Sequence, residues 1–588
     1  MSGIGLLLST AKDALLAQQL ALDVVSHNIA NVNTPGYSRQ IPHLTTRQPA
    51  PYAGMMLGRG VDVEEVIRNT DAFIETRLQQ RKTDLTSLKE QEVYMGALEA
   101  IFNENSKRSL STLFSEFWNA WHDLANNPTG ASERKIVFER ASLLCQSFSG
   151  LHADLMQLTD QLNLSLQAGV SKINEITAKI ADLNQQILAE RTNGNPNDLL
   201  DKRNQLITDL SEYMDIRYYE NDDGSLTVTT GRGYVLVTGS DYYELSYDDG
   251  AIRWESSGGA NRDITDTITG GKMGGWLDMR DETIPEYEAD LNELAKSLIW
   301  EVNRVHTQGA GTERFTNVTG SYAVTNSAAA LDSSGLDFQD KIVDGSFQIW
   351  IYDSNGNVVG SAVSVNIDAD VTSLNNVVTS INSQAGGNLT ASVNSAGKLV
   401  IQALSGCTFA FANDTSGALA ALGINTFFVG SSPTDHDYAR FIDVNSVIEQ
   451  NKGFIAAAKA DSSTGVIASG DNSNALDMTD LPYTIVDMTR YHYERGTSTP
   501  SQESVSGTME DYLHGLVGSV GIKSQSVSRS REYTEVIVNQ LEESRDNISA
   551  VSIDEEMTNI IKYQHAYTAA AKLISTGDEM FRTLLELK

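Results

Sequence analysis

The chain has 588 residues, of which 40% are hydrophobic and 20% are charged. At roughly 150 residues per domain, this length corresponds to about four domains. The apolar content is high enough for folded cores and excludes wholesale disorder. The 43 lysines and arginines against 77 aspartates and glutamates leave a formal net charge of −34, which argues against binding nucleic acid through its phosphates.

The number of cysteines and the distribution of apolar residues exclude further classes of protein. Cys145 and Cys407 are the two cysteines, which excludes a disulfide framework and a zinc site built from several cysteines. No stretch approaches the roughly 18–20 apolar residues that span a bilayer, so we expect no membrane insertion. Lys12 and Asp13 soon interrupt the N-terminal apolar residues, so the features of a cleaved secretory signal are missing. We expect a protein that stays in the cytoplasm or is exported without a cleaved signal peptide.

The N-terminal segment is predicted to be one helix that stops between Asn31 and Gly36, where Pro35 and Gly36 act as breakers. Its apolar or small residues alternate in steps of four and three, the spacing of a heptad seam. The seam consists of Ile4, Leu8, Ala11, Leu15, Gln18, Leu22, Val25 and Ile29.

The middle of the chain changes from helical to β-rich and back. Helical periodicity predicts helices at about 71–104, 109–126 and 131–192, a shorter one through Leu199–Leu210, and one near 283–306. Between the last two, β-branched segments lie at about 215–278, with hairpin turns at Asp222–Gly224 and Asp248–Gly250. A second β-rich block covers 311–480, with a turn at Asn355–Gly356. Helices are expected to return after 480.

The C-terminal segment is predicted to be a second seam helix. A long helix with a seam from Val527 to Val551 precedes it, with a break at about 546–554, and acidic residues at the new helix start suit its dipole. The final seam consists of Ile553, Met557, Ile560, Gln564, Tyr567, Ala571, Ile574, Asp578, Phe581 and Leu585.

The expected fold is therefore mixed and multi-domain: a discontinuous α-helical coiled-coil rod formed by both termini, with inserted β-rich outer domains. Residues 1–62 with 547–588 are expected to form the inner terminal helices and linker. Residues 63–310 with 481–546 are expected to form a helical bundle domain that carries the β-hairpin region at 215–278. Residues 311–480 are expected to form the inserted outer domain or domains.

The terminal helices are expected to order fully only in a polymer. Long helices without tertiary packing are marginal in water, and one partner helix covers only one side. Each terminal helix also has a second face rich in alanine, which includes Ala17 and Ala21 in one helix and Ala570 in the other. These faces indicate more than one close neighbour. Gln18 and Gln564 lie at mid-height on the two seams. A polar seam residue fixes register in some coiled coils and is merely tolerated in others, and both interpretations stay open.

No constellation of acid, base and nucleophile is present, so we expect neither an enzyme nor a cofactor. The glycine-rich stretch 270–275 lacks the spacing of a phosphate loop and is interpreted as a flexible strand–helix junction. Asp353–Asn357 lacks the Gly and Glu of a calcium loop and is interpreted as a hairpin turn. Asp435, His436 and Asp437 could ligate a metal, although a solvated loop is the favoured interpretation.

Several motifs resemble one known family. Residues 22–40, which include Asn28, Asn31, Thr34 and Tyr37, resemble the N-terminal motif shared by bacterial flagellar rod, hook and hook-associated proteins. The stretch 551–567 is similar to the C-terminal end of the hook-associated protein 1 family of hook–filament junction proteins. So are Phe114–Trp118 with Asn127 and Pro128, and Asn197–Arg203. Parts of 345–423 look like a small β insert of several flagellins and hook proteins. Ala550 departs from the family pattern, which usually has Gly there.

This resemblance implies a structural adaptor that polymerises at the hook–filament junction. It implies a ring-like or helical homo-oligomer that contacts hook protein and a second hook–filament junction protein, and an export chaperone that binds the C-terminal helices. It also implies export by the flagellar type III apparatus and an extracellular location in the flagellum. The expected assembly interface consists of Ile4, Leu8, Leu15, Gln18, Leu22, Val25, Asn28, Ile29, Asn31, Thr34, Pro35, Gly36, Tyr37, Ile553, Met557, Ile560, Gln564, Tyr567, Ile574, Phe581 and Leu585.

Two alternatives remain at this stage. The first is a hook or flagellin-type axial protein, although flagellin lacks the Asn-Thr-Pro-Gly-Tyr element and hook protein usually lacks a helix like 131–192. The second is a secreted adhesin or hydrolase that acts through the Ser/Thr/Asn-rich block at 311–480, where no catalytic set is visible.

Overall fold

A computed structural model describes residues 2–52, 55–102, 109–256, 258–259, 261–430, 437–497 and 499–586. The fold is mixed and helix-rich, with several small sheets. It divides into two compact units: unit 1 comprises 1–93, 162–279 and 525–588, and unit 2 comprises 94–161 and 280–524. The three-part division expected from the sequence stays a prediction. No helix among the described residues is both long and apolar enough to cross a membrane.

Unit 1 contains both terminal helices, α1 and α14. The other elements are α5, α6, the β1–β4 and β5–β11 strands, and parts of the long helices α2, α4 and α13. The bounds are α1 Ser2–Ala30, β1 Gln40–Thr46, β2 Ala50–Tyr52, β3 Met55–Leu57, β4 Val61–Arg68, α2 Ala72–Ile101, α4 Ala131–Glu190, α5 Asn197–Tyr213, β5 Ile216–Glu220, β6 Leu226–Thr230, β7 Val235–Thr238, β8 Asp241–Tyr242, β9 Leu245–Asp248, β10 Ala251–Glu255, β11 Asn261–Asp263, α6 Gly271–Asp278, α13 Met509–Ser549 and α14 Ile553–Glu586.

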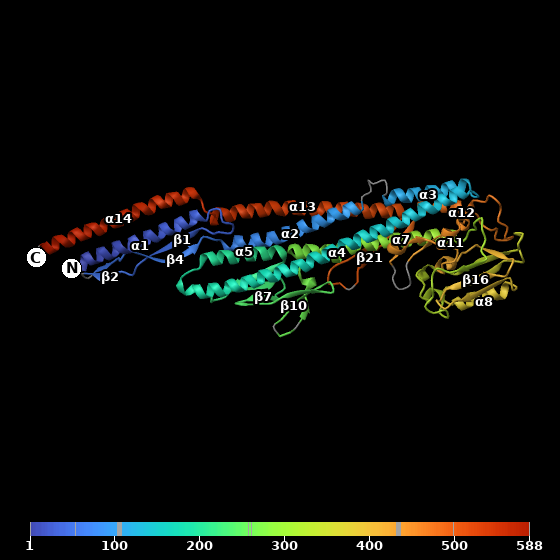
Figure 1. Ribbon diagram of the computed structural model, residues 1–588, viewed down its shortest axis with the longest axis horizontal. Helices are drawn as coiled ribbons and strands as arrows, with labels where there is room; N and C mark the ends of the chain where they lie inside the picture. Colours follow the sequence, from blue (N-terminus) through green and yellow to red (C-terminus); the bar gives the residue numbers. More distant parts are fainter. Residues whose placement is uncertain are drawn as a thin grey trace. The chain divides into compact units, whose positions relative to one another are not determined.

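Helices α1 and α14 lie side by side and run antiparallel (Figure 1). Asn28 near the end of α1 contacts Glu556 near the start of α14. At the other end of the pair, the backbone of Gly577 lies against Leu8, because a Cβ added there would come within 2.7 Å of the Leu8 side chain. The pair is closed by small buried residues, which let the two backbones approach; they include Ala17, Ala21 and Ala570.

A β-hairpin that the sequence analysis missed packs on α1. Strands β1 and β4 pair antiparallel from Gln40 opposite Arg68 to Thr46 opposite Val61, with an irregularity at His43 and Leu44. Arg47 forms an ion pair with Asp13 of α1. The segment expected to be a linker is therefore a two-stranded sheet that covers part of α1.

Helices α2 and α13 form another helical contact of unit 1. Leu78 and Leu85 of α2 bury their side chains against Val538 of α13. Two ion pairs flank this contact, Lys82 with Glu542 at 2.7 Å and Lys89 with Glu535 at 3.2 Å.

The long helix predicted at 131–192 is confirmed as the single 60-residue α4.

The two larger β-sheets of unit 1 have strand orders β5-β6-β7-β8 and β11-β10-β9. Both predicted hairpin turns are confirmed: Gly224 has a positive φ of 87°, and Asp249 and Gly250 have φ of 49° and 78°. Two consecutive positive φ values are the signature of the tight turn that Asp-Gly favours.

The interpretation of 270–275 as a flexible junction is wrong. Gly271 begins α6, and Gly274 and Gly275 lie buried within it. A Cβ on Gly275 would stand 2.5 Å from the carbonyl oxygen of Ser87, and one on Gly271 would meet the backbone of Tyr213 and Met214. These glycines allow backbones to touch, so the segment is closely packed.

Unit 2 is built around α7, whose aromatic and aliphatic side chains pack against α3 and the β-rich segment. Its remaining elements are α3 Leu110–Asn126, α7 Ile284–His306, β12 Asn317–Thr319, β13 Gly345–Tyr352, β14 Val363–Ile367, α8 Leu374–Gln384, β15 Leu389–Val393, β16 Leu399–Ala403, β17 Thr408–Ala412, α9 Ala418–Ala421, β18 Phe428–Val429, α10 Tyr438–Phe441, β19 Asp443–Val444, α11 Ser446–Gln450, α12 Ser473–Asp480, β20 Val486–His492 and β21 Ser501–Gly507. Two three-stranded sheets have the orders β12-β16-β15 and β14-β13-β17.

Two details of unit 2 bear on the sequence predictions. The turn at Asn355–Gly356 is confirmed, because Tyr352 bridges to Val358 and Gly356 has a φ of 82°. The expectation of helices directly after 480 is wrong, because β20 and β21 form an antiparallel hairpin there. The residues of this hairpin are mostly polar and lie partly in solvent, so their apolar alternation is weak.

Candidate assembly site at the terminal helix pair

The turn that follows α1 places the Asn31–Tyr37 element. Asn31 and Thr34 close the helix end, since the Thr34 amide donates to the Asn31 carbonyl at 2.9 Å and the Tyr37 amide donates to the Thr34 carbonyl at 3.2 Å. Gly36 has a φ of 76°, and a Cβ at this position would stand 2.8 Å from Oε1 of Gln205 on α5. Glycine therefore suits this turn for both its conformation and its lack of a side chain.

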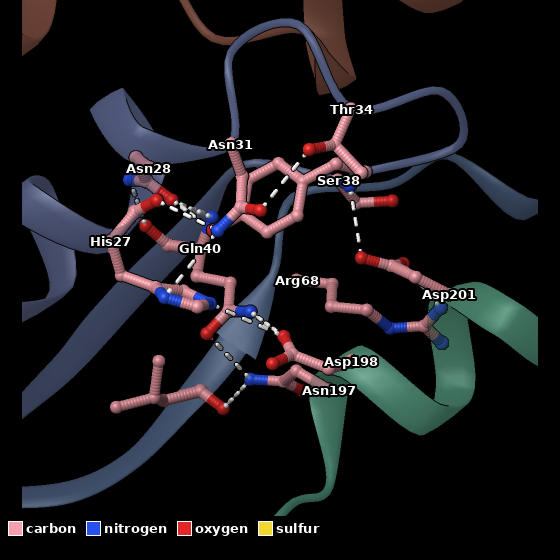
Figure 2. A network of polar contacts seen from close by, with 12 residues as sticks. His27, Asn28, Asn31, Thr34, Ser38, Gln40, Arg68, Asn197, Asp198 and Asp201 are labelled. Carbon is pink, nitrogen blue, oxygen red and sulfur yellow. Dashed lines mark hydrogen bonds and ion pairs between the residues drawn. The ribbon is translucent and has the colours of Figure 1, made fainter.

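Asn28 is the centre of a polar network that begins at this turn (Figure 2). Its side chain is 1% exposed. Nδ2 donates to the Gln40 carbonyl at 2.9 Å and Oδ1 accepts from the Gln40 amide at 2.9 Å, so the carboxamide pairs with the backbone of β1 as a strand neighbour would. The Tyr37 hydroxyl donates to the same Oδ1 at 2.7 Å. Burial raises the pKa of Tyr37, and nearby carboxylates raise it further, so the phenol stays a donor.

The network continues to the start of α14 through Glu556. Asn28 Nδ2 donates to Glu556 Oε2 at 3.2 Å, and Arg39 Nε donates to Glu556 Oε1 at 2.8 Å. Arg39 also forms an ion pair with Glu555 at 3.0 Å. The Glu556 side chain is 1% exposed, and a carboxylate this buried requires a cation and hydrogen bonds. The three contacts tie α14 to the end of α1.

A second arm of the network reaches α5. Gln40 Nε2 donates to Asp198 at 2.9 Å, and His27 Nε2 lies 3.3 Å from the same oxygen. Asp201 accepts from the Ser38 amide at 2.9 Å and from Arg68 at 3.1 Å. Burial raises the pKa of Asp201, and these two donors lower it in part. Figure 2 shows the His27, Ser38, Asp198 and Asp201 side chains converging from α1, the turn and α5.

Two cavities of about 260 and 610 Å³ flank the turn. Both are lined by Thr34, Gly36 and Tyr37, and Pro35 lines the larger one. Asp198 and Asp201 line the larger cavity and are already engaged by donors. The contacts described around the turn hold segments of the chain together.

The predicted seam residues differ in how far their side chains are exposed. Val25 is buried, whereas Ile4, Leu8, Leu15, Gln18, Leu22, Ile29, Ile560, Tyr567 and Ile574 are half-buried. Ile553, Met557, Gln564, Phe581 and Leu585 are exposed, the last at 60%. Further exposed apolar side chains on the same two helices are Leu16, Leu20, Ile561, Leu573 and Met580. These two helices therefore carry many exposed apolar side chains, which in soluble proteins are a common feature of contact surfaces.

The sequence analysis missed several residues of the network. No contact at this site was predicted for Arg39, Gln40 or Arg68, although Arg39 and Gln40 fall inside the quoted motif. Asp198 and Asp201 belong to the quoted Asn197–Arg203 motif, which was the available signal. Asp435 and His436 lie outside the described residues, while Asp437 lies within them.

Three family models match separate parts of the chain. Residues 95–319 match the family described as the flagellar hook-associated protein FlgK helical domain. Residues 8–37 match the flagella basal body rod protein family, and residues 544–587 match the flagellar basal body rod FlgEFG protein C-terminal family. The last two matches cover most of α1 and α14.

Similar curated proteins extend over nearly the whole chain. Flagellar hook-associated protein 1 of Salmonella typhimurium is 26% identical over 99% of this chain and 100% of the relative. The protein of that name from Bacillus subtilis is 26% identical over 97% of this chain and 96% of the relative. The solved structure of the flagellar hook junction protein FlgK from Burkholderia pseudomallei is 16% identical, with a TM-score of 0.49, and covers 81% of this chain and 100% of that one. The chain is thus similar over nearly its whole length to proteins named flagellar hook-associated protein 1, its middle matches the FlgK helical domain family, and its two ends match flagellar rod protein families.

Proposed function

We propose that the chain is a structural adaptor of the bacterial flagellum that polymerises at the hook–filament junction and connects the hook to the filament. The observation that supports polymerisation is the apolar face of α1 and α14, which is left uncovered by the rest of unit 1. Burial of such side chains is worth about 25 cal/mol per Å², so neighbouring copies gain free energy by covering them. In this proposal α1 and α14 line the inner part of a ring-like or helical homo-oligomer and pack there as coiled coils.

Gln18 gives this proposal a second support. Its Oε1 is buried and has no hydrogen-bond partner among the described residues. Buried acceptors in native proteins are nearly always paired. The Gln18 side chain as a whole is only half-buried, so its carboxamide can turn outward to a donor on a neighbouring copy and would then fix the axial register, as polar residues do at coiled-coil core positions.

The remaining partners follow from the family. Hook protein contacts one end of the assembly and a second hook–filament junction protein contacts the other. An export chaperone covers α14, and the chain leaves through the flagellar type III apparatus without a cleaved signal peptide to an extracellular location. The polar network has a holding role, and no catalytic or cofactor role is proposed for this site.

The test replaces exposed apolar residues of α14 by the double variant Phe581→Ser and Leu585→Ser. A matched control, Leu143→Ser with Leu164→Ser, changes two exposed leucines of α4. Both variants should melt like the wild-type monomer, because the altered side chains lie in solvent. In a strain that lacks the chromosomal copy, the control should restore swimming, whereas the α14 variant should give hooks without filaments and flagellin in the medium.

Two results would contradict the proposal. Wild-type swimming by the α14 variant would show that this face is not needed for assembly. Long filaments formed by the purified wild-type chain alone would instead indicate a flagellin-type or hook-type protein.

A further inference from the structure

Three side chains of metal-ligand type meet inside unit 2. His152 lies on α4, Glu288 lies on α7, and Asp437 directly precedes α10. One ligand atom of each lies within 4.8 Å of those of the other two. His152 Nε2 is 3.5 Å from Asp437 Oδ2, and His152 Nδ1 is 3.8 Å from Glu288 Oε1. These distances are too long for good hydrogen bonds, so the three groups converge without satisfying one another.

Two buried polar atoms of this cluster lack a partner. The His152 side chain is 8% exposed. Its Nδ1 and the Oδ1 of Asp437 are buried and have no hydrogen-bond partner among the described residues. Buried polar groups in native structures are nearly always paired, and an exception often marks the place of a water or an ion.

The position of Asp437 strengthens this point. Asp437 is the residue before the first turn of α10, where an aspartate ordinarily accepts a hydrogen bond from the backbone. Its side chain makes no such bond and lies beside His152 instead. The backbone there is fixed on α7, because the Ala439 amide donates to Asn292 Oδ1 at 2.8 Å. The carboxylate is thus placed at the cluster by a segment that is hydrogen-bonded to α7.

The charges of the cluster are incompletely compensated. Burial lowers the pKa of His152, and Arg440 adds to this effect while Asp437 opposes it. Burial, together with Asp437, raises the pKa of Glu288 to about 7. A neutral imidazole offers the lone pair that a metal requires, and a divalent cation would stabilise both carboxylates against their burial and against each other.

We propose that His152, Glu288 and Asp437 bind one divalent transition-metal cation of the Zn²⁺ class. Zinc bonds to nitrogen and oxygen of roughly 2.0–2.2 Å in tetrahedral geometry place ligand atoms about 3.3 Å apart, close to the 3.5 Å between His152 Nε2 and Asp437 Oδ2. One ion takes one nitrogen of the ring, so Glu288, whose nearest ring atom is Nδ1, completes the site by turning its carboxylate toward the ion at Nε2. One imidazole with two carboxylates suits zinc, cobalt or manganese, whereas magnesium and calcium prefer oxygen ligands throughout. The bound ion would join α4, α7 and α10 within unit 2.

The test uses the full, tag-free chain and equilibrium dialysis against Zn²⁺, with Co²⁺ absorption as a second readout. The wild type should bind one equivalent that Glu288→Gln, Asp437→Asn and His152→Asn each weaken about tenfold or more, and should rise in melting temperature with Zn²⁺. The matched control is His492→Asn, which alters an exposed imidazole lying between Glu286 and Glu503. This control should keep the equivalent and its Co²⁺ spectrum.

A measurement on the wild type alone guards against variants that fail to fold. Zinc-edge X-ray absorption of the loaded chain should show one imidazole together with oxygen ligands. The proposal is overturned if the wild type binds no Zn²⁺, if the three variants bind it as the wild type does, or if the zinc spectrum shows no imidazole.

Discussion

The side chain of Asn28 joins the end of α1 to the turn and strand that follow it and to the start of α14, which is 528 residues away. Its carboxamide pairs with both backbone groups of Gln40, accepts from Tyr37 and donates to Glu556. The amide suits this position because a single group both donates and accepts, which neither a carboxylate nor an aliphatic side chain of the same size can do.

We expect Asn28→Asp to weaken the docking of α14. The change replaces the Nδ2 donor by an oxygen next to the Glu556 carboxylate, and an unsatisfied buried group costs about 3 kcal/mol where a charge is involved. Hydrogen exchange at 553–560 in the monomer should become faster. Adding Glu556→Gln restores a donor to the pair and should recover part of the loss. Unchanged exchange in the single variant would contradict the role of Asn28.

His306 predicts acid sensitivity of unit 2. The imidazole is fully buried, its Nδ1 lies 2.8 Å from the Asn425 carbonyl, and its Nε2 accepts from the Ala456 amide. Burial lowers its pKa from 6.5 to about 4, and Arg134 adds to the effect. The unfolded chain therefore takes up a proton that the folded chain refuses, so stability is full above pH 6.5 and is lost as the pH falls toward 4.

Between pH 7 and pH 5 this single group should remove about 2 kcal/mol from the free energy of unfolding. Urea titrations followed by tryptophan fluorescence would measure it, since Trp121 packs against His306. His306→Gln should lose this component of the pH dependence, while exposed His122→Gln should keep it. An identical pH dependence for His306→Gln and the wild type would refute the assignment.

At the scale of elements, the contact between α1 and α14 depends on small residues. Gly577 lies where a Cβ would come 2.7 Å from Leu8 and 3.2 Å from Leu7. An alanine could be accommodated by movement of flexible leucine ends, but a branched side chain would push the helices apart.

Gly577→Val should therefore destabilise the pair by about 1–3 kcal/mol, seen as faster hydrogen exchange at 4–31 in the monomer. Gly521→Val provides the control, because nothing lies within 4 Å of a Cβ at this position of α13. If both valines affected the 4–31 amides equally, close approach at Gly577 would not be the cause.

The sequence predicted the positions of the helices better than the contacts between them. The steps of four and three predict α1 and α14 because helical periodicity is a local property. The same pattern does not reveal that Gly577 lies against Leu7 and Leu8 while Phe581 and Leu585 face solvent. Strands β1 and β4 were missed because Gln40 finds its partner Arg68 beyond the intervening strands β2 and β3, and because the register of the pair shifts between His43 and Leu44.

The candidate sites show the same limit. Asn28, Asn31 and Tyr37 were predicted from a motif, but their link to Asp198 and Asp201 is a tertiary fact without a local pattern. Asp437 was noted as a possible ligand, yet His152 and Glu288 lie on helices whose sequences give no metal-binding spacing. Residues on separate elements become a site only through the fold.

For the whole molecule, the exposed terminal faces predict an uneven distribution of stability. In a dilute monomer the amides of 4–31 and 554–586 should exchange much faster than those of 131–190. Assembly should slow the terminal amides selectively. Deletion of 1–31 or 554–588 should leave a soluble, folded remainder that cannot restore swimming. Equal protection throughout the monomer would remove the expected dependence of the terminal helices on neighbouring copies.

The contact between Asn28 and Glu556 spans 528 positions of the sequence. A ribosome that adds about 5–20 residues per second needs about half a minute to two minutes between these two residues. During this interval the newly made first helix has no last helix to pair with. Helices α1 and α14 can therefore pair only after α14 has been synthesised. Before that, another protein has time to bind α1.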